Sequence, residues 1–235
     1  MPRRGGGPRI DPRSIPAYGL AQASHHLDIS AETLQSWLLG RSYPTAAGVQ
    51  FFEPLVHPAG LDPLRLSFTN LVEAQVLATV RRLHRVPLDD IRAAVRYVES
   101  RVRVPSPLAN QDFLAGQHQL FIEAFGGLIN VGRGGQRAMP EILRDCLERI
   151  ERDEEGLARR LYPMRHRGQA PGPRVVVIDP RVSFGRPVLV GTGIPTAVLA
   201  ERKQAGESIE EIAGDYGCEA PQVTQAIAWE ERQAA

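Results

Sequence analysis

Apolar residues recur at helical spacing in the front of the chain and gather into short runs near its end. Within residues 18–40, three apolar residues lie on one face of a predicted helix: Leu20, Ala23 and Leu27. The polar step that follows ends this helix, and Ser30 is a natural N-cap for a second helix over residues 31–39. Two short helices joined by a tight turn predict a helix-turn-helix.

Residues 41–66 mix prolines and glycines with short apolar pieces, which favours a β-hairpin wing. Ser67 then caps a long predicted helix, and Asp89 with Asp90 begins another, where acidic residues complement the helix dipole. The residues expected to face inward on these two helices are Leu71, Ala74, Val76, Leu77, Val80, Ile91, Val95 and Val98.

The rest of the chain predicts a bridging segment and a small C-terminal domain. The expected elements are a loop over 101–116, a hairpin over 119–130, a helix over 140–161, a linker over 163–173, strands over 175–178 and 187–190, and helices over 196–205, 208–215 and 220–231. The fold class is mainly α with short β hairpins. The expected divisions are a flexible arm over 1–17, a winged helix-turn-helix domain over 18–100, a bridging or dimerisation segment with a linker over 101–173, and a C-terminal domain over 174–235.

Composition fits a soluble globular protein, because 43% of residues are apolar and 23% are charged. No apolar run is long enough to span a bilayer, and the charged, glycine-rich start is not expected to act as a secretory signal. The two isolated cysteines, Cys146 and Cys218, favour a reducing cytoplasm over a disulfide framework or a metal site. Residues 1–110 hold 13 basic and 9 acidic side chains, and this weak excess suits a polyanion.

Double-stranded DNA is the polyanion that a helix-turn-helix would bind, with the outward side chains of its second helix reading base edges. The amide of Gln35 can pair with adenine, and arginines can contact phosphates. The candidate DNA-binding residues are Thr33, Gln35, Ser36, Arg41, Arg65 and His25, joined by arginines 3, 4, 9 and 13 of the arm. The alternative is a structural helix pair, since small helical domains often contain two capped helices and this second helix has no basic residue inside it.

Residues 18–98 resemble the winged-helix arrangement of MerR-type regulators, in which two helices follow the wing as LSFTNLVEAQVLATVRRLHRVPLDDIRAAV does here. The chain departs from those regulators in two respects. It has no cysteine pair suited to a metal effector, and a further domain replaces the long dimerising coil. Metal sensing is therefore not expected.

The C-terminal residues resemble the small antitoxin domain of VapB-like proteins, and the resemblance covers nearly all of 174–230. The motifs that carry it are Asp179-Pro180-Arg181, Phe184-Gly185-Arg186-Pro187, Gly191-Thr192-Gly193-Ile194-Pro195 and Ser208-Ile209-Glu210-Glu211-Ile212-Ala213. A turn containing Cys218 replaces the more usual one. The resemblance implies an antitoxin that binds a PIN-like ribonuclease toxin and represses its own operon as a homodimer on operator DNA.

Two prolines and Gly185 make the loop after the first C-terminal strand rigid. If the resemblance holds, Arg181 or Arg186 could enter the acidic metal site of such a nuclease as a charge-assisted pair. The expected toxin-binding residues are Arg181, Phe184, Arg186, Thr192 and Ile194. An ion pair of Arg186 with Asp179 or Glu201 within the domain is an equally weighted alternative.

Other chemistry finds no support in the sequence. The glycine-rich stretches lack the spacing of phosphate loops, and adjacent His25 and His26 point to different helix faces. No catalytic, cofactor or metal site is therefore expected, and an RNA-processing enzyme is disfavoured. The second functional hypothesis is a MerR-like transcription regulator whose C-terminal domain senses a small molecule.

Overall fold

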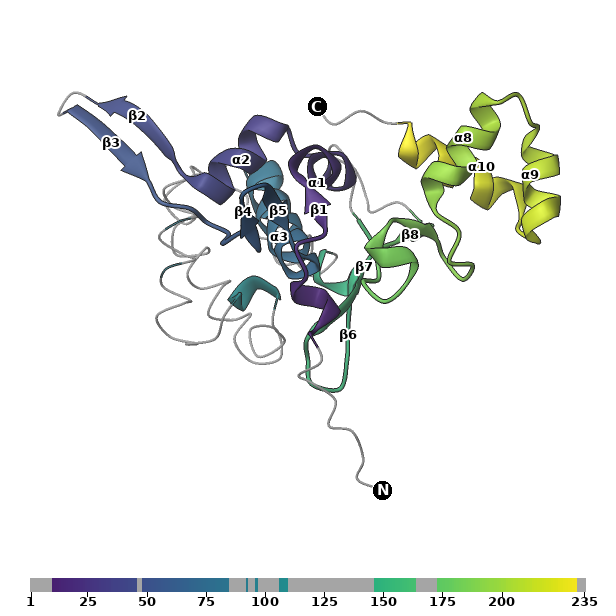
Figure 1. Cartoon of the computed structure of the whole chain (residues 1–235), viewed down its shortest axis with the longest axis horizontal. Helices are drawn as coiled ribbons and strands as arrows, with labels where there is room; N and C mark the ends of the chain where they lie inside the picture. Colours follow the sequence, from purple (N-terminus) through teal and green to yellow (C-terminus); the bar gives the residue numbers. More distant parts are fainter. Residues whose placement is uncertain are drawn as a thin grey trace, which may run out of the picture.

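A computed structural model describes residues 10–45, 48–84, 92, 96, 106–109, 146–163 and 173–231 of the chain. The molecule is elongated (Figure 1). At one end, strands β2 (Arg41–Thr45) and β3 (Gly48–Phe52) form a protruding hairpin. At the other end lie three helices, α8 (Thr196–Gln204), α9 (Ile209–Tyr216) and α10 (Ala220–Glu230).

The predicted helix-turn-helix is confirmed as α1 (Leu20–Leu27) and α2 (Ala31–Leu39). Asp28 adopts a left-handed conformation, and its N–H donates to the carbonyl oxygens of His25 and Ser24 at the end of α1. Ser30 caps α2, because its Oγ accepts the N–H of Thr33. Local capping chemistry thus fixes the turn between the two helices.

The segment predicted as one wing contains two separate hairpins. β4 (Gly60–Leu61) and β5 (Leu64–Leu66) join β1 (Tyr18–Gly19) in a three-stranded antiparallel sheet, in the order β1-β5-β4. The β2–β3 hairpin pairs only with itself among the described strands and extends beyond α2 (Figure 1). The front domain therefore has a short sheet beneath its helices and a long projecting hairpin.

Helix α3 (Phe68–His84) follows this sheet, and the predicted cap is confirmed because Ser67 Oγ accepts the N–H of Asn70. Four of the inward residues are fully buried: Leu71, Ala74, Val76 and Leu77. The helix predicted to start at Asp89 lies outside the described residues, except that Arg92 and Arg96 are helical.

The helix predicted over 140–161 is helical at residues 146–148 but wrong from residue 150 onward. Residues 150–161 form a hairpin of β6 (Ile150–Arg152) and β7 (Ala158–Leu161). Asp153 shapes its turn by accepting the N–H groups of Glu155 and Leu157, and Gly156 has a φ of +79°. Turn chemistry therefore outweighs the helix-like spacing of charges.

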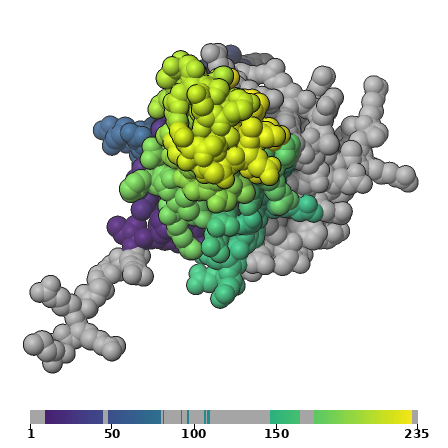
Figure 2. All heavy atoms as spheres, turned by 90° about the vertical axis from the view of Figure 1, so that its right-hand side faces the viewer, coloured from purple at the N-terminus to yellow at the C-terminus, as the bar shows by residue number. Residues whose placement is uncertain are grey.

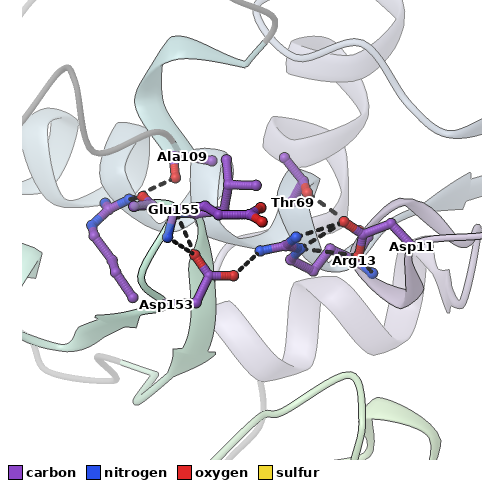
Figure 3. A network of polar contacts seen from close by, with 9 residues as sticks. Asp11, Arg13, Thr69, Ala109, Asp153 and Glu155 are labelled. Carbon is purple, nitrogen blue, oxygen red and sulfur yellow. Dashed lines mark hydrogen bonds and ion pairs between the residues drawn. The ribbon is translucent and has the colours of Figure 1, made fainter.

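Part of the arm predicted to be flexible is anchored. Residues Pro12–Ser14 form the short 3-10 helix η1, and Arg13 pairs with Asp11 at 2.7 Å and with Asp153 at 2.5 Å (Figure 3). The carbonyl oxygen of Arg13 also accepts the hydroxyl of Thr69. These ion pairs hold the pKa of Asp11 below its usual range, mainly through the hydrogen bond from Arg13. Arg13 is thus committed to joining the chain's start to the β6–β7 turn.

The predicted C-terminal elements are confirmed as β8 (Val176–Val177), β9 (Val188–Leu189) and the three helices α8 to α10. Ser208 and Glu211 form a capping box at the start of α9. Figure 2 shows these yellow-green helices covering one side of the molecule, with the teal β6–β7 hairpin below them.

Two larger hydrophobic clusters stabilise the fold. The first runs from Tyr18 through α1, α2 and α3 to Leu161 and Ile178. The second lies among the C-terminal elements, around Leu199 and Ile212. The main chains of Leu161 and Ile178 exchange hydrogen bonds of 2.9 and 2.8 Å, so the β6–β7 hairpin links the two parts.

Several predictions lie outside the described residues: the hairpin over 119–130, most of the loop over 101–116 and of the linker over 163–173, and arginines 3, 4 and 9. Neither Cys146 nor Cys218 forms a disulfide in the described part of the chain.

Candidate nucleic-acid interface and docking loop

The outward face of α2 presents the residues predicted to read DNA. The side chain of Gln35 is exposed, whereas Thr33 and Ser36 are half-buried. Ser36 Oγ donates to the carbonyl oxygen of Thr33, and Thr33 Oγ1 accepts the hydroxyl of Ser30. Gln35 therefore extends furthest from α2 and offers both a donor and an acceptor to a base edge.

Arg41 stands where α2 passes into the β2–β3 hairpin. Its side chain is 63% exposed and lies 3.6 Å from the carboxylate of Glu32, which is itself 84% exposed. An ion pair this exposed contributes little to stability, so Arg41 is available to a phosphate. It adds the positive charge that α2 itself lacks.

Two other predicted DNA-binding residues lie apart from this face. Arg65 belongs to β5, opposite Gly19 of β1 and Gly60 of β4, and so lies on the central sheet rather than on the projecting hairpin. His25 lies on α1 and faces α10, where its Nε2 is 3.5 Å from Glu230 Oε1. The structure thus brings together Thr33, Gln35, Ser36 and Arg41, and it separates Arg65 and His25 from them.

A cluster of aromatic rings joins α1 to α10. The ring centroid of Trp229 lies 5.8 Å from that of His25 and 6.0 Å from that of His26, which it stacks on. Burial alone would raise the pKa of Glu230, but the nearby His25 and the hydrogen bond from Thr196 outweigh burial and hold that pKa below its usual range. The C-terminal helix is therefore seated on the first helix of the helix-turn-helix.

The loop between β8 and β9 presents three of the predicted toxin-binding residues. The side chain of Phe184 is 90% exposed, and Arg181 and Arg186 beside it are exposed as well. Phe184 has a φ of 58°, a left-handed conformation that is unfavourable for a bulky residue. A large apolar ring is thus exposed to water on a loop that also carries two exposed arginines.

Contacts below the loop support this conformation. The hydroxyl of Tyr18 donates to the carbonyl oxygen of Gly185 at 2.9 Å, and the hydroxyl of Ser183 donates to that of Gly193 at 2.8 Å. Burial, and then the charge of Asp179, raise the pKa of the Tyr18 hydroxyl, which therefore stays protonated as a donor. The loop is fixed both within its own domain and from the front domain.

Asp179 forms the base of the same loop. Its carboxylate accepts the N–H of Arg181 at 2.9 Å and the Nε–H of Arg160 at 3.0 Å, and it is almost fully buried. Arg186 donates only to the carbonyl oxygen of Ser183 among the described contacts. In the described part of the chain, the ion pair considered between Arg186 and Asp179 or Glu201 is not formed.

Thr192 and Ile194 lie on the neighbouring turn before α8. Thr192 is exposed, but its hydroxyl accepts the N–H of Ile194 and donates to the carbonyl oxygen of Leu189. Ile194 is half-buried and packs against the second hydrophobic cluster. These two residues shape the turn more than they project from it.

Within the described ranges, no group of three or more potential ligands is arranged to hold a metal ion. None of the described helices combines the length and apolar character that crossing a bilayer requires.

Comparisons with known proteins agree with this division. Residues 16–95 match the family described as "Putative DNA-binding HTH domain", and residues 176–229 match "Protein of unknown function (DUF433)". "Putative antitoxin VapB45" of Mycobacterium tuberculosis is 31% identical over 231 residues, covering 91% of this chain and 93% of that protein. The chain belongs to the VapB45 family.

Two further proteins of Mycobacterium tuberculosis extend the VapB45-family likeness along the chain. "Uncharacterized protein Rv2308" is 24% identical over 225 residues, covering 89% of this chain and 88% of that protein. The crystal structure of Rv2018 superposes with a TM-score of 0.64 and 26% identity, over 91% of this chain and 97% of that one. The chain is thus an antitoxin homologue that carries a DNA-binding helix-turn-helix domain.

Sequence reasoning missed several residues that support these surfaces. Tyr18, Arg160 and Trp229 each act on a residue far away in the sequence, so no local pattern marks them. The one available signal was chemical: a tyrosine or tryptophan in a predicted core needs a partner for its polar atom.

Proposed function

We propose that this chain is the antitoxin of a type II toxin–antitoxin pair, acting at two surfaces. Through α2 and the β2–β3 hairpin it binds operator DNA as a homodimer and represses its own operon. Through the loop around Phe184 it binds a PIN-like ribonuclease and blocks its acidic site. It performs no catalysis of its own.

The exposed Phe184 carries the proposal. A buried aromatic anchor beside arginines is the composition typical of an interface centre, whereas a 90% exposed phenylalanine costs solubility in a free protein. Arg181 and Arg186 have no carboxylate partner among the described ion pairs, so both charges can meet the carboxylates of a nuclease. The curated relative named as an antitoxin supports the same function.

The front surface rests on separate support. The match to a DNA-binding family covers α1 to α3, and Gln35 and Arg41 lie exposed on that part of the chain. The winged-helix arrangement of MerR-type regulators, which residues 18–98 resemble, would set α2 into the major groove.

The test is co-purification of the full chain with the ribonuclease encoded beside it, followed by a binding titration. Phe184→Ala should weaken the complex about thirty-fold, because truncating an aromatic anchor costs about 2 kcal/mol. Phe51→Ala is the matched control, since Phe51 is also an exposed phenylalanine, at 56%, but lies on the β2–β3 hairpin. Equal binding by both variants would contradict docking at this loop.

Gln35→Ala supplies the reciprocal measurement. It should weaken binding to the operator about tenfold, since a paired base contact is worth 1–3 kcal/mol, and leave ribonuclease binding unchanged. Loss of both activities in one variant would refute the division between the two surfaces.

A further inference from the structure

A pocket of about 460 Å³ opens between the recognition helix and the projecting hairpin. Helix α2, one face of the β2–β3 hairpin and two further arginines contribute to its lining. Its lining residues are Glu32, Thr33, Ser36, Arg41, Tyr43, Phe52, Arg81 and Arg92.

Among its described lining residues are three guanidinium groups and one carboxylate. Glu32 lies 3.6 Å from Arg41, so guanidinium groups outnumber carboxylates among the described residues around the pocket. Arginine offers fixed N–H donors that match the oxygens of a phosphate in pairs. The pocket therefore favours an anion of phosphate geometry over a neutral ligand.

Arg81 and Arg92 each lie against an aromatic ring, which holds the side chain in position. The guanidinium carbon of Arg92 lies 4.0 Å from the ring centroid of Phe52, and its Nε donates to the carbonyl oxygen of Glu53. Arg81 lies 5.9 Å from the ring centroid of Trp37. Because these contacts limit the rotamers of both side chains, less entropy is lost when an anion binds.

The remaining wall suits the sugar that accompanies a phosphate ester. Tyr43 and Phe52 stack with centroids 3.9 Å apart and add apolar ring surface beside the arginines. Thr33 Oγ1 accepts from Ser30 and keeps its own hydroxyl proton for a ligand. The volume also exceeds what a lone phosphate fills.

We propose that this pocket binds a phosphate ester, with Arg81 and Arg92 as its anion-binding residues. The phosphate is that of the DNA backbone next to the bases read by α2, and in this respect the inference rests on the proposed operator binding. A free nucleotide offers the same chemistry, and the experiment below separates the two sources.

The first measurement is the salt dependence of DNA binding by the full chain. Fluorescence anisotropy follows a labelled duplex from upstream of its own gene and an unrelated duplex of equal length. Each phosphate contact contributes about 0.9 to the slope of log affinity against log salt. Arg81→Gln should reduce that slope by about this amount and weaken both duplexes by the same factor.

Arg159→Gln is the matched control, because Arg159 is an exposed arginine of β7 and the change removes the same charge. Since Arg81 also contacts Trp37, thermal denaturation checks that Arg81→Gln is folded. Arg41→Gln, at the exposed rim, provides a second variant without a core contact and should also lower the slope.

The second measurement titrates a 5′-mononucleotide, and separately inorganic phosphate, into the chain without DNA, using NMR amide shifts. Nucleotide binding that Arg81→Gln abolishes, with an unchanged DNA slope, would assign the pocket to a free phosphate ester. If neither the slope nor the titration distinguishes Arg81→Gln from Arg159→Gln, the inference is overturned. Absence of any duplex binding by the unaltered chain would instead refute operator binding and leave the titration to decide the pocket.

Discussion

The contact between Tyr18 and Gly185 makes a quantitative prediction about how the two parts of the chain are coupled. A methyl group added at Gly185 would lie 2.3 Å from the Tyr18 oxygen and 3.2 Å from its Cζ. Gly185 also has a φ of +77°, which costs a residue with a Cβ about 1–2 kcal/mol. Gly185→Ala must therefore bear backbone strain and also displace the hydroxyl.

Displacing the Tyr18 hydroxyl breaks a buried hydrogen bond. It leaves this hydroxyl and the carbonyl oxygen of Gly185 without a partner, which costs about 1–3 kcal/mol. Gly185→Ala should thus lower the free energy of unfolding by about 3–4 kcal/mol. Tyr18→Phe should lower it by about 1–3 kcal/mol, because the carbonyl oxygen of Gly185 loses its donor. In the double variant, Tyr18→Phe has already removed the hydroxyl oxygen that lies 2.3 Å from the added methyl group. Gly185→Ala then adds only its backbone strain.

The double variant should therefore be about 2 kcal/mol more stable than the sum of the two single changes predicts. The assay is urea denaturation of all four proteins, followed by fluorescence of the two tryptophans and by circular dichroism. Gly191→Ala is the control: its φ is +82°, but an added methyl meets nothing within 4 Å. It should cost about 1–2 kcal/mol in either background.

Additive effects of Tyr18→Phe and Gly185→Ala, within about 0.5 kcal/mol, would refute the steric reasoning. A cost at Gly191 equal to that at Gly185 would do the same, because it would assign the whole effect to backbone strain.

Two further predictions concern charged contacts. The contacts with His25 and Thr196 hold the pKa of Glu230 below its usual value of about 4.3, so the stability that the Glu230 carboxylate contributes is present above that value. This stability is lost as pH falls through the folded-state pKa. Urea denaturation between about pH 5 and 3 should show Glu230→Gln losing less stability than the unaltered chain, and parallel curves would contradict this. Arg13→Ala should lower the free energy of unfolding by about 2 kcal/mol, since it leaves Asp11 and Asp153 without their half-buried partner. Calorimetry measures this, and an unchanged midpoint would show that the ion pairs contribute nothing.

Sequence patterns predicted the elements whose signals are local. Ser30 and Ser208 each place an acceptor before an apolar run, and both begin helices as expected. The loop around Phe184 was also predicted from its prolines and Gly185, and Phe184 is exposed on that loop.

The errors arose where two local signals competed. In residues 150–161 the alternating charges fit a helix, but Asp153 binds two main-chain N–H groups ahead of it and Gly156 permits a left-handed turn. A hairpin results, and its buried residues Ala158 and Leu161 meet the main core. The packing partner, which the sequence of this segment does not contain, decides between the two structures.

Long-range contacts could not be predicted at all. Tyr18 and Gly185 are separated by 167 positions, and His25 reaches Glu230 only because α10 folds back onto α1. His25 was therefore assigned to DNA from its place beside the turn, while its contacts lie with the C-terminal helix. Arg81 escaped notice because its significance depends on the hairpin across the pocket.

The main-chain hydrogen bonds between Leu161 and Ile178 restrict where natural or engineered recombination can divide this gene without disrupting the fold. A fragment starting after position 173 would lose the strand that hydrogen-bonds Ile178 and would expose that side chain, which belongs to the front core. Chimaeras that exchange the C-terminal domain between relatives should therefore be joined before Ile150, so that the β6–β7 hairpin is transferred together with the C-terminal helices.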